Sequence, residues 1–350
     1  MRRVLFSVLG VGLGHATRVH AILSELRGVK YKILASGEAY KYFRLKGFSP
    51  IKLKGIEFPE KEFAFDLFST LLKNLDYPIK MTANYRKIVS VLEEFEPDAI
   101  FCDSEPSTFL VAEAREYPIY SLTNLITLFD EAKRVSLTRE MERQLLVIKR
   151  LMEHVIRNSE RVFVPAFVKS KSYLRRITYV NPIVRKERGQ VKEKDFYLVM
   201  LGGSPFAYHV LGKVLELASS YEDKRFVIST NWLMRGVSRR RNVVLYPFLP
   251  LSYMKRAKAV ITLGGHSTLS EAVSFKKPVL SIPIKGHVEQ FLNAHMIERL
   301  GFGVMCRRVE RLEKYVEKFF EREEEFRENL ERADIKGNGA EQVARALQGL

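Results

Sequence analysis

The sequence predicts an α/β protein built from two doubly wound units, each a parallel sheet covered by helices on both faces. Two observations carry this prediction. At roughly 150 residues per domain, a chain of 350 residues has room for two domains. Short, continuously apolar runs also alternate with amphipathic segments, as in parallel sheets that are buried on both sides, and the alternation occurs twice.

The expected strands are the apolar runs of this alternation. In the first unit they are Val4–Leu9, Lys32–Ala35, Ala99–Asp103 and Ile119–Leu122. In the second unit they are Phe196–Leu201, Arg225–Ser229, Asn242–Tyr246, Ala259–Leu263 and Pro278–Ile282. Apolar residues at helical spacing predict helices between them, among others Thr17–Arg27, Ser107–Glu116, Leu269–Phe275 and Gln290–Leu300.

A proline and a run of charged residues separate the two units, at Pro182 and just after it. We therefore expect a first domain over residues 1–182 and a second over 183–332. Residues 333–350 are expected to form a C-terminal helix that can pack back on the first domain.

The composition limits the partners and the compartment. Lys and Arg number 58 against 41 Asp and Glu, a net charge of +17, which indicates an anionic partner: nucleic acid, a membrane surface or a phosphorylated substrate. Cys102 and Cys306 lie outside any disulfide or metal-binding spacing, so a reducing, cytoplasmic location is expected. The sequence contains no run of about 18 apolar residues that would span a membrane.

A glycine turn follows the first expected strand, in Gly10-Val11-Gly12-Leu13-Gly14-His15. Gly12 and Gly14 let the backbone approach an anion at a helix start. The dinucleotide fingerprint would require a glycine at His15, so an NAD- or flavin-dependent oxidoreductase is only an alternative.

His15 and Asp103 each follow a strand at the sheet edge where open α/β proteins bind ligands. An imidazole there suits a general base, and a carboxylate partner would orient its ring. The alternatives are a capping or packing role for His15 and a helix N-cap for Asp103.

The second unit contains a strand, a glycine turn and a helix start that carries hydroxyl groups. Ser267 and Thr268 can bind a diphosphate there, and Glu271 one turn later can accept both hydroxyls of a ribose. The alternative is a helix capped by its own Ser and Thr. A similar turn, Gly202-Gly203-Ser204, follows the first strand of this unit.

This segment resembles the nucleotide-sugar signature of the GT-B glycosyltransferases. The core Thr262-x-x-Gly265-x-x-Thr268-x-x-Glu271, the turn Lys277-Pro278 and the late Gln290-x-x-Asn293-Ala294 follow in the order seen in UDP-glycosyltransferases and in the lipid-linked N-acetylglucosaminyltransferase of peptidoglycan synthesis. With the loop that ends at His15 and with Asn181-Pro182, the resemblance covers nearly the whole chain. It implies two Rossmann-like domains that face each other across a cleft.

The resemblance also implies roles for individual residues. His15 would be the base that deprotonates the acceptor, and the neighbouring loop with Gly12 and Gly14 would lie on the acceptor side. The donor would be bound by Gly203, Ser204, Phe248, Leu249, Gly265, Ser267, Thr268, Glu271, Glu289 and Gln290. Leu263 stands where plant members carry a phosphate-binding histidine, and Glu289 replaces the usual Asp or Gln. The role of His266 is open.

The implied activity is inverting transfer of a sugar from a nucleotide diphosphate sugar, with UDP favoured, to a hydroxyl acceptor. No Asp-x-Asp motif is present, so catalysis without a metal or cofactor is expected. An epimerase of the same fold, an oxidoreductase or a basic nucleic-acid-binding protein are the alternatives. Nucleic acid is the disfavoured partner, because no aromatic-rich binding motif accompanies the arginine cluster of Arg235, Arg239, Arg240 and Arg241.

The segment Phe58–Lys80 interrupts the alternation with a crowd of Phe and Leu residues flanked by lysines. A buried helix is one interpretation. The other is an amphipathic element in the membrane interface, which would place a lipid-linked acceptor beside the site at the inner face of the cell membrane.

Overall fold

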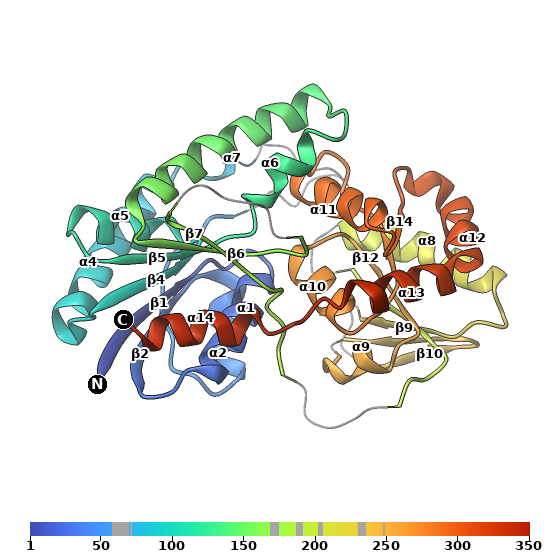
Figure 1. Cartoon of the computed structure of the whole chain (residues 1–350), viewed down its shortest axis with the longest axis horizontal. Coiled ribbons are helices and arrows are strands. Elements are labelled where there is room, and N and C mark those ends of the chain that lie inside the picture. The colour runs from blue at the N-terminus through green and yellow to red at the C-terminus, as the bar shows by residue number, and fades with distance from the viewer. Residues whose placement is uncertain are drawn as a thin grey trace.

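The part of the chain that the computed structural model describes comprises residues 1–57, 70, 72–168, 175–186, 192–201, 206–229, 236–247 and 249–350. Within these ranges the protein has two seven-stranded sheets, one in each half of the chain (Figure 1). The predicted fold class is therefore confirmed.

The first sheet is parallel throughout, with the order β3-β2-β1-β4-β5-β6-β7. Its strands are β1 (Arg2–Val8), β2 (Val29–Ala35), β3 (Ile51–Lys52), β4 (Ala99–Asp103), β5 (Ile119–Leu122), β6 (Arg161–Pro165) and β7 (Ile177–Val180). Alternate residues of β1 serve two cores: Val4 and Phe6 pack on one face, and Leu5 packs on the other. This double burial explains why the strand is continuously apolar.

Helices cover both faces of this sheet. They are α1 (Gly14–Glu25), α2 (Gly37–Leu45), α4 (Tyr77–Phe95), α5 (Pro106–Ala114), α6 (Thr127–Ala132) and α7 (Arg139–Asn158). In α1, Ala16, Val19 and Ile22 recur at helical spacing and are buried against β1. The helix begins three residues before the predicted start, so His15 lies in its first turn.

The second sheet has the order β10-β11-β9-β8-β12-β13-β14, and only β10 pairs antiparallel. Its strands are β8 (Tyr197–Met200), β9 (Phe226–Ser229), β10 (Ser238–Arg240), β11 (Val243–Tyr246), β12 (Ala259–Thr262), β13 (Val279–Ser281) and β14 (Gly303–Met305). The helices of this half are α8 (Phe206–Ser220), α9 (Ser252–Arg256), α10 (His266–Ser274), α11 (Val288–Arg299), the 3-10 turn η1 (Val309–Arg311), α12 (Leu312–Glu321) and α13 (Glu323–Ala333).

The last helix, α14 (Gly339–Gln348), returns to the first half and packs against α1 (Figure 1). Ala340, Val343 and Leu347 join the core that contains Val19 and Ile22. The domain boundaries expected at residues 182 and 332 stay predictions. Within the described ranges, no helix is both long and apolar enough to cross a bilayer.

The two halves touch through α11, which packs against α6 and α7, and through α10, which packs against α1. Leu128 and Met141 share an apolar cluster with Val288 and Leu292. Beside it, Arg299 Nη2 donates to Glu131 Oε2 over 2.7 Å. These contacts bring the carboxyl ends of strands from both sheets toward the same region.

Candidate functional site

His15 and Asp103 meet where the strand order of the first sheet reverses, between β1 and β4. Open α/β sheets bind ligands at this point. His15 comes from the first turn of α1, and Asp103 is the last residue of β4. The His15 Nδ1 and Asp103 Oδ1 atoms are 2.8 Å apart. The histidine side chain is 23% exposed and the carboxylate is fully buried. The expected pairing of His15 with a buried carboxylate is therefore present, and the role of His15 as a base stays a prediction.

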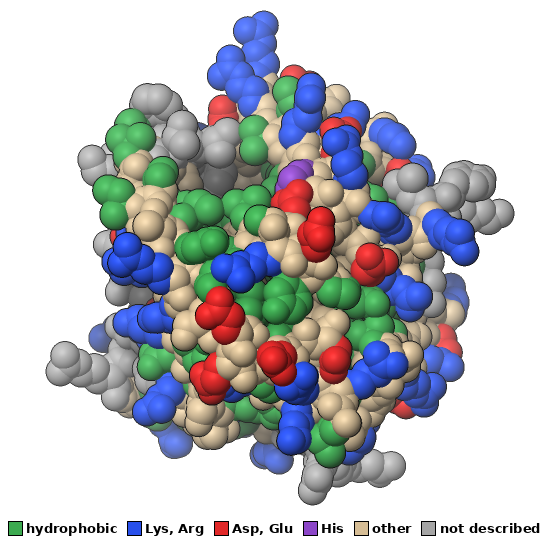
Figure 2. All heavy atoms as spheres, turned by 90° about the vertical axis from the view of Figure 1, so that its left-hand side faces the viewer, with side chains coloured by type: hydrophobic (Ala, Val, Ile, Leu, Met, Phe, Trp, Pro, Cys, Tyr) green, Lys and Arg blue, Asp and Glu red, His purple; other side chains and the backbone are tan. Residues whose placement is uncertain are grey.

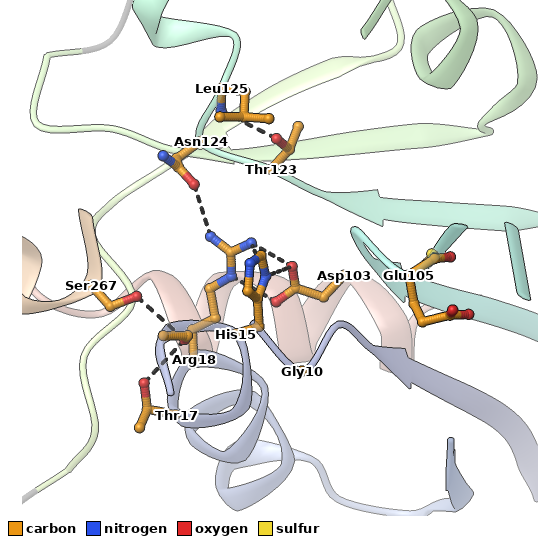
Figure 3. A network of polar contacts seen from close by, with 12 residues as sticks. Gly10, His15, Thr17, Arg18, Asp103, Glu105, Thr123, Asn124, Leu125 and Ser267 are labelled. Carbon is orange, nitrogen blue, oxygen red and sulfur yellow. Dashed lines mark hydrogen bonds and ion pairs between the residues drawn. The ribbon is translucent and has the colours of Figure 1, made fainter. Parts of the chain in front are cut away.

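Arg18, one helical turn after His15, also binds Asp103 (Figure 3). Its Nε donates to Asp103 Oδ2 over 2.6 Å, and its Nη2 donates to Oδ1. Burial by itself raises the pKa of Asp103, but Arg18 and His15 outweigh it and lower that pKa to about 2. Asp103 is therefore ionised throughout the physiological range.

The alternative role of Asp103 as a helix cap is wrong. Glu105 is the N-cap of α5, and its side chain accepts hydrogen bonds from the backbone N–H groups of Ser107 and Thr108. The carboxylate that caps α5 thus comes from Glu105, the second residue after β4. Asp103 instead bonds to His15 and Arg18.

Asn124 links this cluster to the other half of the chain. Arg18 Nη1 donates to Asn124 Oδ1 over 3.0 Å, and Asn124 Nδ2 donates to Glu289 Oε1 over 2.9 Å. Burial raises the pKa of Glu289, but His287, the Asn124 hydrogen bond, His266 and His15 together lower it. Next to it, Gln290 Oε1 accepts the N–H of Ile284 over 3.1 Å.

The start of α10 is open. Its N-cap is Gly265, no side chain caps it, and its first turn holds no acidic residue. The alternative in which Ser267 and Thr268 cap their own helix is therefore wrong. Ser267 Oγ instead donates to the carbonyl of Gly14 over 3.3 Å, so the predicted diphosphate site touches the predicted acceptor loop (Figure 3).

Gly264 explains the shape of the turn before α10. Its φ of +92° lies in the left-handed region, and a Cβ there would stand 2.9 Å from the carbonyl oxygen of Gln290. The turn therefore requires glycine to bring the strand end, α10 and the start of α11 together.

Glu271 lies inside α10, is buried, and is paired with Arg185 from the segment after β7. Arg185 Nε donates to Glu271 Oε1 over 2.8 Å. Burial lowers the pKa of Arg185, but Glu271 and Tyr42 outweigh it and raise that pKa. The expected ribose ligand thus already has a cationic partner.

His266 is buried, and its ring stacks on Phe167 with centroids 5.2 Å apart. Burial first and the Arg18 charge second lower the pKa of His266 to about 4, so the ring is neutral at physiological pH. Its Nδ1 lies 3.4 Å from Ser270 Oγ. Leu263 is also buried, in the core of the second half.

Several predicted residues lie outside the described residues: Gly203, Ser204, Phe248, and 58–69 with Leu71 from the aromatic segment. Gly12 precedes α1 with a φ of +64°. Leu249 is buried just after the end of β11. Among the described residues, no group of three or more His, Cys, Asp or Glu side chains is placed to hold a metal ion.

The sequence interpretation missed three residues of this site: Arg18, Asn124 and Arg185. Arg18 had a usable signal, because it interrupts the apolar face of α1 formed by Ala16, Val19 and Ile22. A charged residue on such a face needs a buried partner. Asn124 and Arg185 carried no comparable signal, since each lies in a loop whose path the sequence does not predict.

Comparison with known proteins identifies the family to which the chain belongs. The family described as glycosyl transferase family 1 matches residues 2–323. This chain belongs to glycosyl transferase family 1. Family membership decides against the oxidoreductase and nucleic-acid-binding alternatives and confirms the recognition of a glycosyltransferase.

Relatives of this family 1 member include archaeal and bacterial proteins. It is 25% identical to an uncharacterized glycosyltransferase of Methanosarcina acetivorans over 331 residues, 87% of this chain and 85% of the relative. It is 28% identical over 328 residues to the UDP-N-acetylglucosamine–N-acetylmuramyl-(pentapeptide) pyrophosphoryl-undecaprenol N-acetylglucosamine transferase of Thermotoga neapolitana, 89% of this chain and 88% of the relative. The glycotransferase of kitacinnamycin has a similar fold, with a TM-score of 0.70, 16% identity and coverage of 99% and 98% of the two chains.

Proposed function

We propose that this glycosyltransferase is an inverting, metal-independent hexosyltransferase that moves a sugar from a UDP-linked donor to the hydroxyl of a lipid-linked acceptor. The observation that carries the proposal is the meeting of two features. The His15–Asp103 pair of the first half lies next to the uncapped start of α10 in the second half, and Ser267 bonds to Gly14 between them.

In the proposed reaction, His15 Nδ1–H donates to Asp103, which leaves Nε2 to take the proton of the acceptor hydroxyl. The acceptor oxygen attacks the anomeric carbon as the bond from that carbon to the diphosphate breaks. One direct displacement inverts the anomeric configuration. The leaving diphosphate is stabilised by the N–H groups at the start of α10 and by the hydroxyls of Ser267 and Thr268.

The donor lies mainly on the second half in this proposal. Glu271 accepts the ribose hydroxyls, Gly203 and Ser204 add donors to the phosphates, and Phe248 with Leu249 contacts the base. Glu289 and Gln290 contact the sugar. Support comes from Ser267, which bonds to Gly14 next to His15, and from Glu289, which interacts electrostatically with His15, with α10 beside α1.

An apolar acceptor has support from the first half. A cavity of about 420 Å³ lies between α6 and α7, and its lining includes Phe129, Val135 and Leu145 together with Lys133. The described part of the segment Phe58–Lys80 also exposes apolar side chains, since Leu72, Leu75 and Ile79 are 49%, 69% and 74% exposed. We infer that the protein binds peripherally to an anionic membrane through this surface.

Basic side chains are available to assist such contact. Figure 2 shows the end of the molecule that carries the first half, with Lys and Arg side chains scattered around the rim and hydrophobic side chains exposed nearer the centre, among Asp and Glu side chains. The net charge of +17 adds long-range attraction to anionic lipid.

The decisive experiment measures binding and product together. Calorimetry with UDP, GDP and TDP is expected to show binding, tightest for UDP. Incubation with UDP-glucose, UDP-N-acetylglucosamine and extracted polyprenyl or glycolipid acceptors is expected to release UDP and form a glycoside of inverted configuration, read by NMR. Absence of nucleotide binding contradicts the proposal. An isomerised nucleotide sugar formed without acceptor supports the epimerase instead.

The membrane part is tested by co-sedimentation with vesicles of increasing phosphatidylglycerol content at low and high salt. Binding is expected to rise with anionic lipid and to fall with salt. It is expected to drop in the variant Leu75→Ser/Ile79→Ser and in Phe65→Ser/Phe68→Ser. Leu45→Ser is the matched control, because Leu45 is 72% exposed on α2, which covers the opposite face of the sheet. Equal sedimentation with and without anionic lipid contradicts the membrane role.

A further inference from the structure

Asp103 is shared between two basic groups, which makes this base unlike a simple histidine–aspartate pair. Arg18 holds both carboxylate oxygens through Nε and Nη2, while His15 Nδ1 holds one of them. Arg18 Nη2 also lies 3.0 Å from His15 Nδ1. The negative charge of Asp103 is thus already balanced by the guanidinium before His15 takes up any proton.

Protonation of His15 would therefore create an excess positive charge at this point. Asp103 is fully buried and the Arg18 side chain is only 5% exposed, so bulk water screens the cluster poorly. An imidazolium beside a guanidinium in such surroundings is unfavourable unless a further anion is near.

Glu289 is the anion in position to balance it. It belongs to α11 in the other half and reaches the cluster through Asn124, whose amide oxygen accepts from Arg18 and whose amide nitrogen donates to Glu289. The amide can satisfy both neighbours in one orientation only. His15 and Glu289 are also close enough to interact electrostatically.

The other titratable groups that face this cluster do not replace Glu289. His266 from α10 is buried and His287 before α11 is half-buried, and desolvation lowers the pKa of each. Both rings are therefore neutral near pH 7. The charged groups that act on His15 are thus Arg18 on its own helix, Asp103 on β4 and Glu289 on α11.

We propose that Glu289 is the counter-charge for protonated His15, and that Arg18 and Asn124 are positioning residues that connect the two. The proposal rests on the proposed role of His15 as the base. Because Glu289 comes from the donor-binding half, its distance from His15 depends on how the halves are arranged. His15 is then most basic when the two halves are closed around the donor and Glu289 lies near it. Proton transfer is thereby limited to the complex in which the donor is bound between the halves.

The test uses diethyl pyrocarbonate, which acylates the unprotonated imidazole. The full-length protein is treated at a series of pH values, and peptide mass spectrometry measures how much His15 has reacted at each pH. No substrate is needed, so the result is independent of the proposed activity. The midpoint of reactivity is expected to move down by about half a pH unit in Glu289→Gln and up by roughly one unit in Arg18→Gln. Arg18→Lys keeps the charge and is expected to stay near the wild type.

Glu298→Gln on the same helix is the matched control, since Glu298 is bonded to Arg307 outside the cluster. It is expected to leave the midpoint unchanged, and the reactivity of His154 in the same digests provides an internal reference. Because Arg18 is buried, its variants are first compared with the wild type by circular dichroism. If Glu289→Gln is folded and the His15 midpoint does not move, the counter-charge proposal is wrong even if His15 is the base.

Discussion

The helices α5 and α10 occupy equivalent places in the two sheets, because each follows the strand that pairs with the first strand of its sheet along the chain: β4 pairs with β1, and β12 pairs with β8. Their first turns differ. The start of α5 is closed by the Glu105 carboxylate, which accepts the N–H groups of Ser107 and Thr108. The start of α10 follows Gly265 and has no side-chain cap. The same topology thus leaves the backbone N–H groups of the helix start without a side-chain cap in the second half and caps them with a carboxylate in the first.

The side chains around these starts divide the chemistry in the same way. The first half gathers charge at the strand ends, in the ion pair of Arg18 with Asp103 and in the histidine beside it. The second half places hydroxyl groups on α10 and keeps His266 of the same helix buried and neutral. The comparison teaches that the first half concentrates charged side chains at its strand ends, whereas the second half presents hydroxyl groups at an uncapped helix start, which is the division that the proposed function requires.

The sharpest way to break this comparison is to remove the base. His15→Ala is expected to lower kcat by about 10²–10⁴-fold, as for the loss of a general base. The affinity for UDP is expected to stay the same, because the proposed nucleotide site lies in the other half. Transfer kinetics and calorimetry measure the two effects separately. Normal turnover in the variant, or a large loss of UDP affinity, would show that the two halves do not divide the work in this way.

The buried histidine of the second half gives a prediction on stability. The folded chain resists protonating His266 down to about pH 4, while the unfolded chain protonates it near its ordinary pKa of 6.5. The free energy of unfolding is therefore expected to fall as the pH drops from about 6.5 to 4, by on the order of 3 kcal/mol from this residue.

Urea unfolding followed by circular dichroism at pH 7 and pH 4.5 measures the loss. His266→Gln is expected to reduce the difference between the two pH values. It does not abolish it, because burial also lowers the pKa of His20 and His287. Asp103 contributes in a lower window: its pKa of about 2 means that its stabilisation is lost only as the pH falls below about 4. An unchanged pH dependence in His266→Gln would contradict the assignment.

The sequence predicted the strand ends of this site well and the connections between them poorly. Ala99–Asp103 and Ile119–Leu122 are strands with the predicted bounds, because continuous apolar runs between polar residues have one stable arrangement in a covered parallel sheet. The strands β3, β6, β7, β10 and β14 were missed, since they are short or bounded by residues without a turn signal. Contacts such as Asn124 with Glu289, 165 residues apart, depend on how the halves pack and leave no local pattern.

The donor half is tested through Glu271. Glu271→Gln is expected to weaken UDP binding by about 1.5–3 kcal/mol, roughly ten- to hundredfold in Kd, because charge-assisted bonds to ribose hydroxyls are lost. The variant also removes the carboxylate that pairs with the half-buried Arg185 and leaves Tyr42 as its other partner, which is destabilising. The double variant Glu271→Gln/Arg185→Gln separates the two effects. It is expected to regain thermal stability and to bind UDP weakly, and UDP affinity at the wild-type level in it would rule out the ribose contact.

The smallest expected effect concerns the contact between the two halves at Gly14 and Ser267. A Cβ on Gly14 would lie 2.9 Å from Ser267 Oγ, so Gly14→Ala forces that hydroxyl to rotate away from the Gly14 carbonyl that it now binds. The loss is one weak hydrogen bond. We expect the activation free energy for kcat/KM to rise by about 0.5–1 kcal/mol, so that kcat/KM falls a few-fold. Ser267→Gly removes the hydroxyl, and Gly14→Ala in that background is expected to cost nothing more, so a double-mutant cycle isolates the contact.

Gly212→Ala is the matched control, because a Cβ on Gly212 in α8 meets no atom within 4 Å. Strictly additive losses in the cycle would mean that the two loops do not touch while the enzyme turns over, and that the closed arrangement of the halves is not the one in which the sugar is transferred.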